Sequence, residues 1–192
     1  MNTPPAGVLW WLHKLQAMAW LLVGQDARAR RIFDAMLQRW PGDAYALASR
    51  AHLAAQAGQR PAAVADLQAL LQGHPQAGAS HWFNLAFLLE ELDRLDEAEA
   101  AFREAVAQDP KLDRAWYGLG LTLLRLGRHD DAVVALKKNT ELQPMSPYGW
   151  VQLARVHMKR HDPQAAMKVI RHLKGFEPKV AEQLQRETGL QV

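Results

Sequence analysis

A period of 34 residues runs through most of this sequence. Tryptophan recurs at that interval at Trp82, Trp116 and Trp150. Proline follows intervals of 34 or 35 residues, at Pro41, Pro75, Pro110, Pro144 and Pro178. Three further rows keep the register: Ala29, Ala63, Ala98, Ala132 and Ala166; Phe33, Leu67, Phe102, Leu136 and Ile170; and Ala17, Ala51, Ala86, Gly120 and Ala154. A fixed period of roughly 20–50 residues predicts a chain that stacks one supersecondary unit many times.

Local signals indicate that the unit is a pair of helices. Leu and Ala dominate the composition while β-branched residues are sparse, which favours helix over sheet. Asp162–Pro163 and Ser146–Pro147 each read as an N-cap followed by proline at the first helical position. We expect Gly24, Gly58 and Gly127 to form the tight turns between paired helices.

The pattern resembles the tetratricopeptide repeat family, and one repeat carries the signature best, through Trp116, Leu119, Gly120, Gly127, Ala132, Leu136 and Pro144. The resemblance implies an all-α fold, a right-handed α-solenoid of antiparallel helix pairs. We place an N-terminal segment at 1–9, five repeats at 10–43, 44–78, 79–112, 113–146 and 147–180, and a C-terminal capping helix and tail at 181–192, with the helix near Val180 to Glu187.

Gly118 and Gly120 invite a second interpretation, a loop that cradles phosphate. A dinucleotide fingerprint would need a third glycine where Leu123 stands, and a strand before it. We therefore predict that Gly120 lets its helix approach the partner helix beside Ala132. We expect Gly118 to mark a close approach on the groove side.

The resemblance also implies a function, a non-catalytic scaffold or adaptor that holds a peptide or helix of another protein in the concave groove. The family's groove positions carry aromatic, apolar and charged residues here, and acidic partner residues would suit the basic ones. The predicted partner-binding residues are Tyr45, His52, Phe83, Phe87, Arg114, Tyr117, Leu121, Arg125, Tyr148, Arg155 and Lys159.

The first repeat departs from the pattern, because its helix carries an apolar stripe where an end repeat should be polar. The stripe consists of Trp11, Leu15, Met18 and Leu22. It predicts contact with a second copy of the chain, giving a homo-oligomer, or with a membrane surface or the N-terminal segment. The alternative is a rotated helix whose stripe packs wholly within the solenoid.

Other chemistry is weakly supported. The chain has no cysteine, which excludes disulfides and thiolate sites and fits a cytoplasmic location. His157 and His161 lack a third metal ligand, and adjacent acids such as Asp130 and Asp131 point apart. We expect no enzyme, cofactor or metal, and a net charge of +3 is too small to indicate nucleic acid. The segment from Val8 to Val23 is too short and polar for a membrane span.

Overall fold

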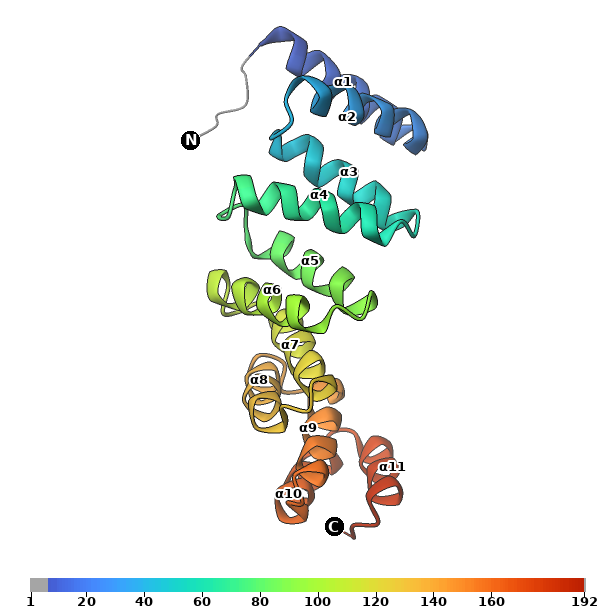
Figure 1. Cartoon of the computed structure of the whole chain (residues 1–192). Helices are drawn as coiled ribbons and strands as arrows, with labels where there is room; N and C mark the ends of the chain where they lie inside the picture. Colours follow the sequence, from blue (N-terminus) through green and yellow to red (C-terminus); the bar gives the residue numbers. More distant parts are fainter. Residues whose placement is uncertain (1–6, 192) are drawn as a thin grey trace. The chain divides into compact units, whose positions relative to one another are not determined.

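The computed structural model describes residues 7–191, which form eleven helices and no strands (Figure 1). The helices are α1 (Val8–Leu22), α2 (Asp26–Arg39), α3 (Ala44–Gln56), α4 (Arg60–Gly73), α5 (Ala79–Glu91), α6 (Leu95–Gln108), α7 (Asp113–Arg125), α8 (His129–Leu142), α9 (Pro147–Lys159), α10 (Pro163–Lys174) and α11 (Pro178–Thr188). The all-α prediction is confirmed. The predicted N-terminal segment lies outside the described residues over 1–6, and α1 begins within the rest of it.

The chain divides after Leu92 into two units, which we describe separately. In unit 1, α1 packs on α2 and α3 on α4, while α2 touches α3 and α4 touches α5. In unit 2, α7 packs on α8 and α9 on α10, with α6 against α7 and α8 against α9. Helix α11 contacts both α9 and α10, which confirms the predicted C-terminal capping helix.

The periodic rows of the sequence form the core. The alanines at 29, 63, 98, 132 and 166 are fully buried, and the large apolar row from Phe33 to Ile170 is at most 3% exposed. Helices can approach closely where a small side chain faces a large one from the neighbouring helix. The 34-residue period therefore places the same kinds of packing residue in each successive helix pair.

Gly120 is a packing residue, as predicted. A Cβ atom built on it would lie 2.7 Å from Cγ of Leu136 in α8, the helix that also carries Ala132. The expectation for Gly118 was wrong in its direction. Its Cβ would lie 2.4 Å from Cζ of Phe102, a buried side chain of α6, so Gly118 faces the preceding helix and not a groove. Two residues of helix span about 200°, which turns neighbouring glycines toward different helices.

The tryptophan and proline rows are joined by hydrogen bonds. The indole Nε1 of Trp82 donates to the carbonyl oxygen of Pro75 at 3.0 Å. Trp116 donates to Pro110 and Trp150 to Pro144, each at 2.9 Å. Each bond ties the first turns of a helix to the loop before it. The 34-residue period therefore repeats a hydrogen bond as well as apolar packing contacts.

The predicted turns and caps are largely as observed. Gly24, Gly58 and Gly127 have positive φ angles of 69°, 71° and 74°. The Asp162 side chain accepts a hydrogen bond from the Ala165 amide, which confirms it as an N-cap. Ser146 occupies the N-cap position of α9, but its side chain forms no capping hydrogen bond.

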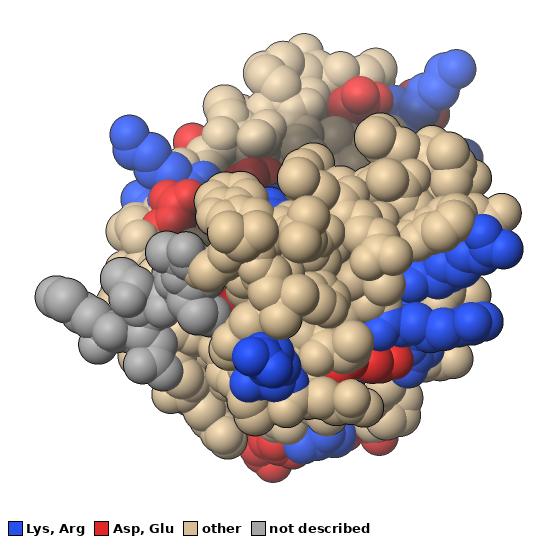
Figure 2. Space-filling view, turned by 90° about the horizontal axis from the view of Figure 1, so that it is seen from above, with Lys and Arg blue, Asp and Glu red and all other residues tan. Residues whose placement is uncertain are grey.

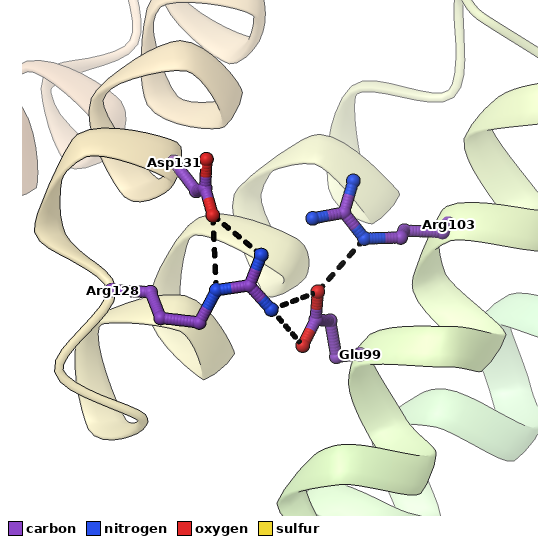
Figure 3. A network of polar contacts seen from close by, with 4 residues as sticks. All are labelled: Glu99, Arg103, Arg128 and Asp131. Atoms are coloured by element: carbon purple, nitrogen blue, oxygen red, sulfur yellow. Dashed lines mark hydrogen bonds and ion pairs between the residues drawn. The ribbon is translucent and has the colours of Figure 1, made fainter.

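Polar networks join helices within each unit. In unit 2, buried Glu99 of α6 accepts hydrogen bonds from Arg103 and Arg128, and Arg128 also pairs with Asp131 of α8 (Figure 3). In unit 1, Arg50 of α3 joins helices in a similar way. It donates two hydrogen bonds to buried Asp66 of α4.

Of the helices in residues 7–191, none combines the length and apolar character that crossing a membrane requires.

Candidate functional site

The predicted partner-binding residues fall in both units. Tyr45 and His52 lie on α3, and Phe83 and Phe87 lie on α5, so these four belong to unit 1. The others lie on α7 and α9 in unit 2: Arg114, Tyr117, Leu121, Arg125, Tyr148, Arg155 and Lys159.

Unit 1 contains a pocket of about 370 Å³ between α3 and α5, with Arg60 and Leu67 of α4 also contributing to its wall. Most of the lining is apolar, but polar groups converge on it from both helices. The lining residues are Ala48, Ala51, His52, Ala55, Arg60, Leu67, His81, Asn84, Phe87, Leu88 and Glu91. A concave, mainly apolar cavity with a few polar groups is the usual form of a ligand site.

Two aromatic rings lie along α5, and one of them, Phe87, lines this pocket. Phe83 and Phe87 stack with ring centroids 6.5 Å apart and an interplanar angle of 22°. Phe87 lines the pocket and is 47% exposed, which is unusual for such a large apolar side chain. Covering this ring would remove apolar surface from water at little cost in side-chain entropy, as at protein-interface hot spots.

The charged residues of the pocket neutralise each other. The guanidinium of Arg60 donates to the carboxylate of Glu91 at 2.5 Å. Burial lowers the pKa of His81, so its imidazole is neutral at pH 7. The pocket therefore presents hydrogen-bonding groups from His52, His81 and Asn84 beside an apolar floor.

Tyr45 lies at a neighbouring pocket, which shares Ala48 and His81 with the first. Its ring makes edge contacts with Phe33 and Trp10 at centroid distances of 5.9 and 6.0 Å, and the ammonium of Lys14 lies 4.6 Å from its centroid. Burial raises the pKa of its hydroxyl. Much of this side chain is engaged in packing α3 against the first two helices.

In unit 2, two of the predicted cations already have partners within the chain. Arg155 forms hydrogen bonds with both carboxylate oxygens of Glu187 in α11, the closest at 2.9 Å. Arg125 pairs with Asp93 at 2.5 Å. These ion pairs are partly exposed and contribute little to stability, but an acidic ligand would have to displace them.

The remaining unit 2 positions differ in exposure. Tyr148 is 70% exposed, and Arg114 and Lys159 are also exposed. Tyr117 and Leu121 are half-buried. Partner contact at these residues stays a prediction.

The stripe on α1 is exposed. Trp11, Leu15, Met18 and Leu22 have 52%, 59%, 43% and 86% of their surface accessible. The alternative in which the stripe packs wholly within the solenoid is therefore wrong, because α2 takes up only one side of α1. Self-association through this stripe stays a prediction.

Two polar residues of the pocket, His81 and Asn84, were not among the residues predicted from the groove positions of the repeat family. A stripe at helical spacing could have revealed them, since His81, Asn84, Leu88 and Glu91 follow one another at intervals of three, four and three residues. All four line the pocket.

The histidines and adjacent acidic residues that were considered as metal ligands or catalytic groups lie in different settings or form ion pairs within the chain. His157 is buried in α9, whereas His161 is exposed in the following turn with a φ angle of 57°. Asp130 pairs with Arg160, and Asp131 with Arg128. In the part of the chain that the structure describes, no three acidic, histidine or cysteine side chains form a group that could hold a metal ion.

Comparison with known proteins agrees with the repeat pattern. The family model for the tetratricopeptide repeat matches residues 48–113 and 88–138. No curated protein sequence matches the chain.

Similar solved structures are helical repeat proteins. A structure of MamA has a TM-score of 0.77 at 20% identity, covering 86% of this chain and 96% of MamA. MamA 41-end from Desulfovibrio magneticus RS-1 gives 0.75 at 19% identity, with 96% and 99% covered. YrrB, described as a TPR protein with an unusual peptide-binding site, gives 0.79 at 16% identity, with 88% of each chain covered. At these identities the similarity shows the fold alone.

Proposed function

Because this chain is a tetratricopeptide repeat protein, we propose that it is a non-catalytic interaction module that binds a peptide segment of a partner protein between α3 and α5. The observation that carries the proposal is the pocket lined by both helices, with the exposed ring of Phe87 at its wall. Proteins of this architecture use their repeated surfaces mainly to hold partners. An adaptor role in the cytoplasm is part of the proposal.

The chemistry of the pocket defines the ligand that fits. An apolar side chain of the peptide would cover Phe87 and the alanines of α3, while His52 and Asn84 would bond to peptide backbone groups. Because Arg60 is paired with Glu91, no uncompensated charge at the pocket selects an acidic peptide. The description of YrrB as peptide-binding supports this use of the fold, although its low identity does not extend to the residues.

This proposal moves the main contact away from α9. The sequence pattern favoured four cations as the residues that attract an acidic partner: Arg114, Arg125, Arg155 and Lys159. Of these, Arg125 is paired with Asp93 and Arg155 with Glu187. Tyr148 and Lys159 remain available as a further contact surface in unit 2.

Selection from a random peptide library tests the proposal. Peptides retained by the wild-type protein should share an apolar residue, and Phe87→Ala should weaken their binding by roughly 30-fold or more, since a hot-spot truncation costs about 2 kcal/mol or more. The matched control is Val134→Ala, which truncates an exposed apolar side chain on α8 and should leave the Kd unchanged.

The proposal fails if the library yields no binder, or if selected peptides bind wild type and Phe87→Ala equally. Equal binding to these two proteins, combined with a loss in Tyr148→Ala, would place the contact on α9 instead.

A further inference from the structure

Helix α1 is apolar around most of its circumference, yet only Trp10 and Ala17 are buried. Eight large apolar residues from this helix and the residue after it are exposed: Val8, Leu9, Trp11, Leu12, Leu15, Met18, Leu22 and Val23. Their accessible fractions reach 86% at Leu22. A contiguous exposed apolar surface of this size marks a site of contact with a partner or a membrane.

Basic side chains lie beside the aromatic rings of the first helix pair. The guanidinium of Arg28 is 4.5 Å from the ring centroid of Trp20, and the ammonium of Lys14 is 5.1 Å from that of Trp11. Arg39 lies over Trp40 at 5.7 Å. Figure 2, which looks onto this end of the chain, shows a broad surface without charged groups, with Lys or Arg side chains at its margins and Asp or Glu side chains among them.

Acidic groups do not balance these cations. Residues 8–39 contain five Lys or Arg and two Asp, a difference of +3. One of the two, Asp34, is bonded to Arg50 of α3, which leaves Asp26 as the exposed acid of this helix pair. The surface is therefore apolar in its centre and positive at its edge.

We propose that α1 docks in the plane of an anionic lipid membrane surface. Apolar residues of the helix would enter the boundary between headgroups and acyl chains, with tryptophan at the headgroup level. Arg28, Arg39 and Lys14 would meet lipid phosphates, which attract basic side chains close to the bilayer. With 15 residues, α1 is too short to span the bilayer, so it lies along the interface.

The charge pattern favours lipid over a second copy of the chain. In a symmetric dimer the same face meets itself, so the positive margins of the two copies would come together. Juxtaposed like charges oppose such a contact, whereas an anionic surface is complementary to it. The lipid proposal does not rest on the peptide site, because that site lies on α3 and α5.

Vesicle co-sedimentation of the full chain tests this inference, using phosphatidylcholine vesicles with and without phosphatidylglycerol. We expect binding to the anionic vesicles, at least about tenfold weaker binding to the neutral ones, and a decrease as salt is raised. Leu15→Glu/Leu22→Glu should reduce anionic binding by about tenfold or more, and Arg28→Glu/Arg39→Glu should do the same.

Two controls separate the surface from general effects. Val134→Glu changes an exposed apolar residue on α8, and Lys168→Glu/Arg171→Glu reverses two exposed charges on α10; both should bind like wild type. Circular dichroism checks that each variant is folded, which the exposure of the replaced residues favours.

Three results would overturn the inference: no binding to either vesicle, equal binding to both, or equal losses in the control variants. A chain that ignores vesicles but forms dimers in analytical ultracentrifugation, lost in Leu15→Glu/Leu22→Glu, would identify a second copy as the occupant.

Discussion

Gly118 and Gly120 stand two residues apart in α7 and touch two different helices, through Phe102 of α6 and Leu136 of α8. Both partner side chains are at most 1% exposed, so neither can move aside without disturbing the core. Each glycine is therefore part of the packing on its side of α7.

We predict that Gly120→Ala destabilises the protein by up to about 2 kcal/mol, the usual overpacking cost of roughly 1–3 kcal/mol less the gain in helix propensity. The new Cβ would overlap Leu136, and this outweighs the gain of about 1 kcal/mol that alanine has over glycine within a helix. Urea unfolding measures the difference in free energy.

Gly73→Ala is the matched control, because Gly73 ends α4 and has no atom within 4 Å of its added Cβ. It should be neutral or slightly stabilising. Equal stability of Gly120→Ala and Gly73→Ala would show that the α7–α8 contact has room to adjust.

At the residue scale, the sequence indicated which positions are packed more readily than which residues they contact. The repeat register marked Gly120 as a small packing residue, because its row is alanine elsewhere. It could not identify Phe102 as the neighbour of Gly118, since that contact depends on how α6 crosses α7. The helical spacing of His81 with Asn84 and Leu88 was visible in the sequence, but the pocket was not, because it lies between two helices.

Among the helices of unit 1, α3 is tied to both of its neighbours through one side chain. Arg50 donates to Asp66 of α4 at 2.6 and 2.8 Å and to Asp34 of α2 at 2.8 Å. Asp66 is 7% exposed, and its hydrogen bond is the largest cause of the raised pKa of Arg50. A buried carboxylate without its cation is costly.

We predict that Arg50→Ala destabilises unit 1 by roughly 2–4 kcal/mol, because it leaves the Asp66 carboxylate buried and unpaired. Asp34→Ala should cost less than about 1 kcal/mol, since the Asp34 side chain is 44% exposed. Thermal and urea unfolding compare the two variants.

The double variant Arg50→Leu/Asp66→Leu distinguishes charge burial from packing. It should recover most of the loss, because no unpaired charge remains in the core. A double variant as unstable as Arg50→Ala would mean that the shape of the arginine, not its charge, holds the helices together.

Elements were the most predictable level. Helices α3, α5, α7 and α9 begin at Ala44, Ala79, Asp113 and Pro147, the first residues of four predicted ranges. Caps, prolines and apolar spacing act over a few residues and can be read directly. The ion pair of Arg155 could not be predicted in this way, because its partner Glu187 lies 32 positions further along the chain, in another helix. The division into five repeats stays a prediction.

For the molecule as a whole, the terminal helices have the fewest buried residues. Helix α1 buries Trp10 and Ala17, and α11 buries Ala181 and Leu184, whereas α4 and α6 bury six residues each. In a repeat protein each element is stabilised mainly by its immediate neighbours, so the ends open with the lowest free energy.

We therefore predict that amide hydrogen exchange is fastest in α1 and α11 and slowest in the inner helices of each unit. Anionic vesicles should then slow exchange in α1 by about tenfold or more while leaving α11 unchanged, because lipid would cover only the exposed residues of α1. Mass spectrometry of peptic fragments resolves the two helices, which makes α11 the internal control. Equal slowing in both helices would indicate general adsorption to lipid, and unchanged exchange in α1 would contradict the docking of that helix.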